Sequence, residues 1–314
     1  MYDKFKFIGL EQTKQKYLDE LTFRSGLSLF NTEQFLEQFV DDFEFLKLND
    51  DSNFQNGFIL TKMKNRFGFH RHRLPRMART SGYVFSSRSV KQERLERDID
   101  SFLDALVESA SSKSFINFES NMSPYIANKV HHFSKHTVNR NLVFDFSPSK
   151  KVPASLEIEH LFKENIRRQV KKSNKNYSFE LVELDDRVFQ LIKETFNRNG
   201  IGMPITIEDQ AFLRKLQIEH PSLLHVNAAI SNATGDLEAA VLVLNDLFSH
   251  RYLYSGVTVN ALQNGTISGL LNRRMKEAVA KGKTFDFCGS NSAGIARFFQ
   301  ALGGQSELYF TVTK

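Results

Sequence analysis

The second half of the chain alternates between helical and extended spacings of its apolar residues. Apolar positions three and four residues apart predict a helix from Pro153 to about Val170. Alternation of apolar and polar residues then predicts a strand at Tyr177–Leu184. Asp185 begins a further helix, which Asn199-Gly200 ends.

The same reading continues to the C-terminus. Thr206 and Asp209 resemble a capping box and predict a helix after them. Further strands are predicted at 224–231, 237–244, 251–255, 284–287 and 308–312. Helices are predicted at 266–281, with Gly282 just past its end, and at 293–302. The order β-α-α-β-β-β-α-β-α-β indicates a mixed sheet with helices on both faces, in the α/β class.

The first half follows a looser version of this order. Strands are predicted at 27–30, 43–48, 57–64, 115–118 and 142–146, and helices at 32–40 and 90–108. Two prolines bracket the polar segment Ser147–Pro153, which is typical of a joint between domains. We therefore expect two domains, residues 1–147 and 148–314.

Composition agrees with two ordinary globular domains. The chain has 314 residues, of which 41% are hydrophobic and 25% charged. The net charge of +6 is unevenly spread, because Asn53–Gln92 contains no acidic residue. A second basic run comprises Lys163, Arg167, Arg168, Lys171, Lys172 and Lys175. Such runs attract phosphates, although each is equally typical of a solvated surface.

The single cysteine, Cys288, excludes an intrachain disulfide and a zinc–cysteine cluster. His132 and His136 are four residues apart, but no third ligand accompanies them, so no metal site is expected. The longest purely apolar run, Ala239–Leu244, is too short to span a membrane, and Met1–Leu10 lacks an apolar core of the length expected for a signal peptide. We expect a cytoplasmic protein without an integral membrane segment. Peripheral contact with the inner membrane face through the basic runs stays open.

Three segments carry a resemblance to a known family. They are Phe162–Lys172, then Tyr252–Gly256 with Gly265–Leu271, and finally Phe285-Asp-Phe-Cys-Gly-Ser290 with Gly294–Gly304. They resemble the tandem-GNAT acyltransferases of the FemAB-like and CelD-like type, and the last segment is the most specific of the three. The resemblance extends from about Ala154 to the end of the chain.

The resemblance implies two GNAT-like domains in tandem, each a mixed twisted sheet flanked by helices. Residues 148–314 would bind the donor and catalyse the reaction. The activity would be transfer of an acyl or aminoacyl group by direct attack of an amine on a sugar, peptide or cell-envelope precursor. The co-substrate would be acyl-CoA or aminoacyl-tRNA, with no tightly bound cofactor. The acceptor could be nucleotide-linked and tRNA could be a partner, whereas the oligomeric state is not indicated.

In the family, the donor's phosphates bind at the start of a helix. The corresponding residues here are Asn264, Gly265, Thr266, Ser268 and Gly269. Free N–H groups and the helix dipole favour an anion there, and glycine permits close approach. An ordinary helix start explains the same residues. The family's coenzyme A loop, [RQ]-x-x-G-x-[GA], does not fit in register, so the resemblance leaves the donor undecided.

Asp286 is the candidate general base. Alternation places Phe285 and Phe287 on one face of a strand and Asp286 on the other, where a raised pKa would suit a base. A structural Asp that caps the following turn is the alternative. Tyr254 and Ser290 are candidates to protonate the leaving group or to bind the acyl carbonyl.

Three arginines are candidate substrate-binding residues: Arg167, Arg168 and Arg297. Each could contact a phosphate, and Arg297 could instead pair with Asp286. A second function class stays open, namely a non-catalytic protein on a GNAT scaffold that binds nucleic acid or an anionic surface. Cys288 lacks a partnered histidine in the sequence and is interpreted as a packed thiol.

Overall fold

The structure, a computed structural model of the chain, describes backbone at residues 22–25, 42–47, 57–64, 70–72, 83–87, 97, 101, 104, 115–118, 135–144, 158–245, 249–289 and 292–313. The chain divides into two compact units, Met1–Arg140 with Glu307–Lys314, and Asn141–Ser306. The predicted joint at Ser147–Pro153 lies outside the described residues, and the predicted domain boundary stays a prediction.

The first unit contains an antiparallel sheet in the order β1-β5-β3-β2, with β4 added to β3. Its strands are β1 (Thr22–Ser25), β2 (Asp42–Lys47), β3 (Gly57–Lys64), β4 (His70–His72) and β5 (Tyr83–Ser87). Separately, β6 (Phe115–Phe118) pairs with the last residues of β13 (Gln305–Thr313).

The strands predicted at 43–48, 57–64 and 115–118 are confirmed as β2, β3 and β6. The predicted strand 27–30 and helix 32–40 lie outside the described residues. Of the predicted helix 90–108, Arg97, Ser101 and Asp104 are helical and exposed, as expected for its polar face. The sequence reading missed β1, β4 and β5, and β7 (Lys135–Phe144) begins earlier than the predicted strand.

The second unit is an α/β domain built on a mixed sheet in the order β12-β11-β10-β9-β8. The strands are β8 (Tyr177–Leu181), β9 (Leu224–Ser231), β10 (Leu237–Asn245), β11 (Ser249–Val257) and β12 (Thr284–Asp286). Neighbours are antiparallel except β11 and β12, which are parallel. The end of β7 pairs with β12, so β12 lies between two strands.

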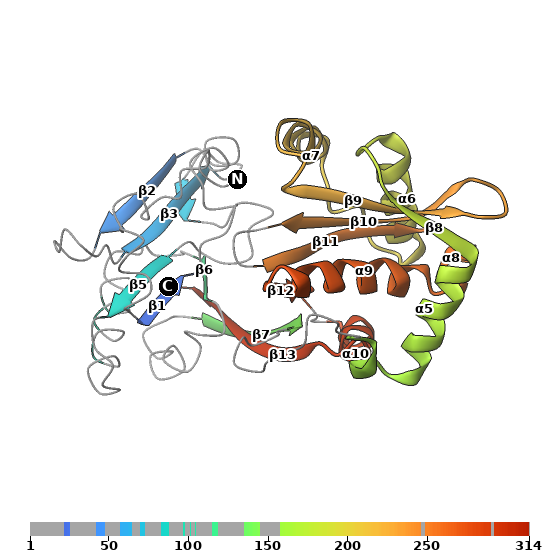
Figure 1. Cartoon of the computed structure of the whole chain (residues 1–314). Coiled ribbons are helices and arrows are strands. Elements are labelled where there is room, and N and C mark those ends of the chain that lie inside the picture. Colours follow the sequence, from blue (N-terminus) through green and yellow to red (C-terminus); the bar gives the residue numbers. More distant parts are fainter. Residues whose placement is uncertain are drawn as a thin grey trace. The chain divides into compact units, whose positions relative to one another are not determined.

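Helices cover both faces of this sheet (Figure 1). They are α5 (Glu164–Asn176) after a short 3-10 turn, η4 (Ile158–Leu161), then α6 (Asp186–Arg198), α7 (Ile207–Glu219), α8 (Val259–Gln263), α9 (Thr266–Ala280) and α10 (Ala293–Ala301). Buried residues of α5, α9 and α10 share one hydrophobic core with Ala239, Val241 and Val243 of β10. The alternate residues of β10, such as Ala240 and Leu242, are buried on the opposite face, which α6 and α7 cover.

The predicted helix caps are present. Asp185 accepts hydrogen bonds from the N–H groups of Arg187 and Val188, and Thr206 forms a full capping box with Asp209. Gly282 follows α9 with a φ of 65°, the left-handed conformation typical of that position. These local signals fix where α6, α7 and α9 begin or end, and therefore how each helix lies across the sheet.

A polar network lies between the sheet and the C-terminal half of α9. Arg274, 2% exposed, pairs with Glu277 and donates from Nη2 to Oδ1 of Asn245 at 3.0 Å. The Nδ2 of Asn245 lies 3.1 Å from Nε2 of His225. Burial, reinforced by the charge of Arg274, lowers the pKa of His225 to about 4 and that of fully buried His250 to about 3.

These histidines predict a loss of stability in acid. Their ordinary pKa is 6.5, so below that pH the unfolded chain binds more protons than the folded one. The free energy of unfolding should be fully retained above pH 6.5 and fall as the pH decreases toward 4. In His250→Leu, the slope of urea-derived stability against pH over this window should decrease by about 1 kcal/mol per pH unit. The slope should stay unchanged in the exposed control His160→Gln, and an unchanged slope in His250→Leu would contradict the assignment.

Candidate functional site

The candidate site lies where β11 and β12 stop pairing. The register joins Ser249 to Thr284, His250 to Phe285 and Arg251 to Asp286, and β12 then ends while β11 continues to Val257. Within the described part of the chain, β11 from residue 252 onward pairs on one side only, with β10. One edge of β11 therefore presents backbone groups that no described strand uses.

A β-bulge decides which face each tyrosine of β11 takes. Tyr254 pairs with Leu242 and Tyr252 pairs with Val243, so Leu253 is an extra residue on β11. Tyr252 packs against Phe299 of α10, with ring centroids 5.8 Å apart, and its hydroxyl lies 2.6 Å from Oγ of Ser255. Tyr254 instead shares its face with Gly256, which meets the backbone of α6. Burial raises the pKa of Tyr254, and the charges of Asp209 and Cys288 add to the effect.

Asp286 also faces away from the aromatic core, as predicted. Phe285 and Phe287 are both buried in that core, and Phe287 stacks on Phe299 at 4.4 Å. Asp286 as a whole is 6% exposed, and its carboxylate lies 3.4 Å from Nη1 of Arg251 and accepts a 2.8 Å hydrogen bond from the N–H of Cys288. A cation and an N–H donor both stabilise a charged carboxylate.

The hydrogen bond from the N–H of Cys288 gives Asp286 a structural role. Cys288 has a φ of 54°, a conformation uncommon for a residue with a side chain, and Gly289 follows with a φ of 106°. The hydrogen bond from its N–H to Asp286 holds this turn, which directs the chain away from the sheet. The turn-capping alternative considered from the sequence is thus observed, and it leaves the second carboxylate oxygen toward Arg251.

Arg251 is a site residue that sequence reasoning missed. It is 7% exposed and lies 35 positions from its partner, so no local pattern connects the two. No sequence signal identifies it, because its polar neighbours Ser249 and His250 hide the fact that this end of β11 is buried. Once the burial is known, a charged residue there needs a partner. With Tyr254 and Asp286, Arg251 forms a group on one face of the sheet, beside the unpaired edge of β11.

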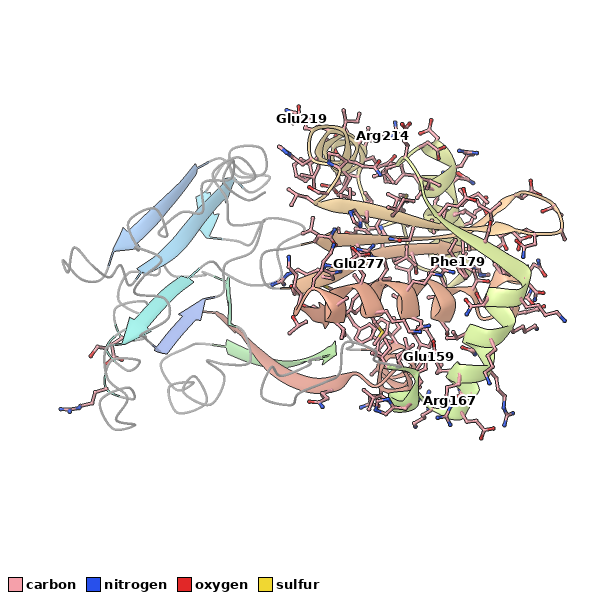
Figure 2. The ribbon with its side chains drawn as sticks, in the orientation of Figure 1. Glu159, Arg167, Phe179, Arg214, Glu219 and Glu277 are labelled. Carbon is pink, nitrogen blue, oxygen red and sulfur yellow. The ribbon has the colours of Figure 1, made fainter. Side chains whose placement is uncertain are left out.

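The remaining candidates lie elsewhere. Arg297 is exposed on α10. Asp286, which the sequence suggested as its possible partner, pairs with Arg251. Arg167 is exposed on α5 (Figure 2), and Arg168 forms an exposed pair with Glu164 on the same helix. Ser290 lies outside the described residues.

The segment Asn264–Gly269 begins α9 and packs against α5. A Cβ on Gly265 would lie 2.4 Å from Cβ of Gln169, and one on Gly269 would lie 2.5 Å from Oγ of Ser173. The side chain of Ser268 donates to Gln169 at 2.7 Å. That of Thr266 donates to the carbonyl of Ala261 at 2.8 Å. Both glycines are therefore required for the close approach of two helices, and both hydroxyls already have partners.

No group of three His, Cys, Asp or Glu side chains in the described residues is arranged to hold a metal ion. None of the described helices combines the length and apolar character that crossing a membrane requires.

Comparison with known proteins gives a likeness of fold. No family model and no curated protein matches the sequence. Among solved structures, FemX matches with a TM-score of 0.62 and 12% identity, over 87% of this chain and 88% of that one. L-PGS from Bacillus licheniformis matches with a TM-score of 0.50 and 12% identity, over 98% and 94%. A tandem GNAT protein from the clavulanic acid biosynthesis pathway matches with a TM-score of 0.41, at 12% identity over 84% and 81%.

The Arg251–Asp286 pair predicts coupled stability effects. Arg251→Met leaves a buried carboxylate without its cation and should lower the free energy of unfolding by about 3 kcal/mol. The double variant with Asp286→Asn should lose at least about 1 kcal/mol less than the sum of the single losses. Urea unfolding of all four proteins measures this coupling, and additive losses would contradict a direct interaction.

The packing of α9 on α5 predicts a cost for any side chain at position 269. Gly269→Ala should lower the free energy of unfolding by about 1–3 kcal/mol, because the new methyl group overlaps Ser173. Adding Ser173→Ala should recover part of that loss. The control Gly202→Ala, where a Cβ meets nothing within 4 Å, should change stability by less than about 0.5 kcal/mol. Equal effects at 202 and 269 would refute the packing explanation.

Proposed function

We propose that the chain is a transferase that moves an acyl or aminoacyl group from an activated donor to an amine by direct attack. The observation that carries the proposal is the edge of β11 beside Tyr254 and Asp286, with which no described strand pairs. The fold shared with FemX and L-PGS, together with the resemblance in the sequence, supports the same class.

In this proposal the donor's extended arm adds to the edge of β11. Backbone groups from residue 252 onward would bond an arm that carries amide groups, as an added strand does. The reacting carbonyl would then lie between Tyr254 and the turn at Cys288. That turn begins two residues after Asp286, which pairs in register with Arg251 at the point where the β11–β12 pairing ends.

Tyr254 would supply the proton that the leaving group needs. The ordinary pKa of a tyrosine is 10 and burial raises that of Tyr254 further, so the phenol is protonated at neutral pH, the form that a general acid requires. Asp286, held by Arg251, would receive the acceptor's ammonium and act as the base toward it. Ser290 would be a further donor to the acyl carbonyl.

The donor that this chain fits better is an aminoacyl-tRNA. At Asn264–Gly269 the side chains are bonded to neighbouring helices, so only backbone amides of the first turn of α9 would remain for a coenzyme A phosphate. FemAB-like members that use aminoacyl-tRNA also depart from the coenzyme A loop. The exposed cations of α5, including Arg167 and Arg168, would contact the RNA backbone, and Arg297 would add a further phosphate contact.

The acceptor in this proposal is an amine of a sugar, peptide or cell-envelope precursor, with a nucleotide-linked form included. The reaction would take place in the cytoplasm, where both donor types are made. The exposed basic side of α5 also favours a second candidate, a non-catalytic protein that binds nucleic acid. That candidate predicts binding that falls with salt and ignores whether the tRNA is charged.

A donor panel tests the proposal on the full chain. Acyl-CoA thioesters, aminoacyl-tRNA and uncharged tRNA are compared by thermal unfolding, and transfer to amino sugars and short peptides is measured in single turnovers. A donor present at 100 times its Kd should stabilise the protein by about 2.7 kcal/mol. Tyr254→Phe should reduce the transfer rate by at least about 100-fold without weakening donor binding.

The matched control is Tyr252→Phe, whose hydroxyl bonds to Ser255 on the opposite face. Its transfer rate should stay within about threefold of the wild type, because general acid catalysis is assigned to Tyr254. The proposal fails if no donor supports transfer, or if the two phenylalanine variants are equally impaired. Equal, salt-sensitive binding of charged and uncharged tRNA without transfer would establish the second candidate instead.

A further inference from the structure

The edge of β11 with which no described strand pairs is closed at Val257 by side chains of α6. The N–H of Val257 donates to Oγ1 of Thr195 at 2.9 Å. The carbonyl of Val257 accepts from Oγ1 of Thr195 at 3.2 Å and from Nη2 of Arg198 at 2.8 Å. Both backbone groups that an added strand would use at this position are therefore already bonded.

Gly256 brings α6 close enough for this closure. A Cβ on Gly256 would lie 2.4 Å from the backbone N of Ile192. Thr195 and Arg198 follow Ile192 at intervals of three residues, so all three lie along one side of α6. Because the strand has no side chain at Gly256, the helix lies directly on it, and the next turn carries Thr195 and Arg198 to Val257.

The pairing with β10 decides which residues of β11 face the open edge. Val257 lies opposite Ala239, and the N–H of Thr258 donates to the carbonyl of Glu238 at 2.8 Å. In an antiparallel pair, the backbone groups of successive residues point alternately toward the partner strand and away from it. Thr258 points toward β10, so Val257 and Ser255 point away from it.

Ser255 is therefore the regular position between the bulge and Val257 whose backbone faces the open edge. No described strand pairs with Ser255 on that side, and the residue is partly exposed. One N–H and one C=O on a single residue match one residue of an added antiparallel chain, whose own C=O and N–H face them. The edge thus fits one residue rather than an extended chain.

An α-aminoacyl group has this pattern of polar groups. Its carbonyl can accept from the N–H of Ser255, and its amine can donate to the carbonyl of Ser255. Antiparallel pairing places the carbonyl of the ligand toward Tyr254 and its amine toward Val257. The carbonyl is then on the side where transfer is proposed. A plain acyl group lacks the amine and would form only one of the two bonds.

We propose that Thr195 and Arg198 are specificity residues of the transfer site. By closing the edge at Val257 they confine the donor to a strand of one residue on Ser255, which an α-aminoacyl group fills. A peptidyl group would continue along β11 and reach Val257 two residues further on, where Thr195 and Arg198 occupy its place. This role rests on the proposed function, because it names the chemical class of the donor at the same site.

Four stable mimics of the end of an aminoacyl-tRNA test the assignment by titration calorimetry on the full chain. Each carries one acyl group on 3′-amino-3′-deoxyadenosine: propionyl, glycyl, N-acetylglycyl or N-acetylglycylglycyl. The glycyl probe should bind at least about tenfold more tightly than the propionyl probe, which has a methyl group in place of the amine. N-acetylglycylglycyl should bind at least about tenfold more weakly than N-acetylglycyl, because only the longer of these two uncharged groups reaches Val257.

Variants of α6 show whether the closure causes this rejection. In Thr195→Ala/Arg198→Ala the N–H of Val257 is free to donate to the acetyl carbonyl of the longest probe. The two N-acetyl probes should then bind within about threefold of each other, or the longer one more tightly. Thr195→Ser keeps the hydroxyl and should keep the rejection, as should Lys193→Ala, at an exposed position of the same helix. A merely structural role would weaken all four probes alike and leave their ratios unchanged.

The assignment is overturned if none of the probes binds, if propionyl binds as tightly as glycyl, or if the wild type binds both N-acetyl probes equally. It is also overturned if the double variant still rejects the longer probe. Failure of the proposed function is a separate result. If the probes are discriminated as expected but no donor supports transfer, the binding site stands and the transferase assignment falls. Transfer from an acyl-CoA without this discrimination would leave the transferase assignment and overturn the role of Thr195 and Arg198.

Discussion

The short parallel pairing between β11 and β12 is the constraint on which the second unit depends. Phe285 and Phe287 anchor β12 in the core, while Asp286 between them holds the N–H of Cys288 and thereby ends the strand. The chain turns away there, and the edge of β11 beyond Arg251 is left without a partner strand among the described residues. A longer β12 would occupy that edge with protein backbone, and the proposed donor arm would have nowhere to pair.

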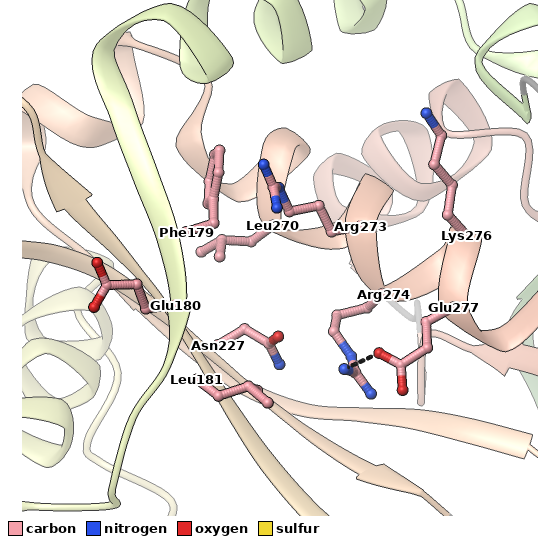
Figure 3. Close-up of a pocket in the computed structure, with 9 residues that line it drawn as sticks. All are labelled: Phe179, Glu180, Leu181, Asn227, Leu270, Arg273, Arg274, Lys276 and Glu277. Carbon is pink, nitrogen blue, oxygen red and sulfur yellow. Dashed lines mark hydrogen bonds and ion pairs between the residues drawn. The ribbon is translucent and has the colours of Figure 1, made fainter.

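The helix α9 covers one face of this sheet, and the two faces carry different groups. On the side of the sheet that it covers, α9 packs on α5, closes the aromatic core and buries the network around Arg274. The opposite side carries Tyr254, Asp286 and Arg251, and α6 packs there on Gly256. The two faces thus hold chemically different groups, with the Arg251–Asp286 pair on one and the buried network of Arg274 and Asn245 on the other. Figure 3 shows Arg274 of this network beside Glu277, with which it pairs.

Local sequence signals predicted much of the second unit, because they act through neighbouring residues. Asp185, the Thr206–Asp209 box and Gly282 mark helix ends through contacts within four residues, and these positions are confirmed. Similarly, alternation predicted β9 and β10 to within one residue at each end. The five-residue helix α8, capped by Thr258, is not among the predicted elements, because so short a segment has no periodicity to detect.

What depended on distant contacts was not predictable. The bulge at Leu253 decides the face of Tyr254, yet Tyr252, Leu253 and Tyr254 give no alternation from which to infer it. Gly265 and Gly269 could serve either a phosphate or a helix, and only the position of α5 explains them as packing residues. Arg251 needed knowledge of a partner 35 positions away. Ser290 and the predicted joint between the domains lie outside the described residues.

The most direct test of the central claim uses the single cysteine of the chain. Cys288 is partly exposed, and its N–H bonds to Asp286, which pairs in register with Arg251, so its backbone lies near the point where the β11–β12 pairing ends. The rate at which iodoacetamide alkylates Cys288 is measured with and without a saturating donor, either an acyl-CoA or an aminoacyl-tRNA. If the donor arm pairs with β11, alkylation should slow by at least about tenfold, since a bound arm excludes the reagent and solvent from the thiol. An unchanged rate with a donor that demonstrably binds would contradict the claim.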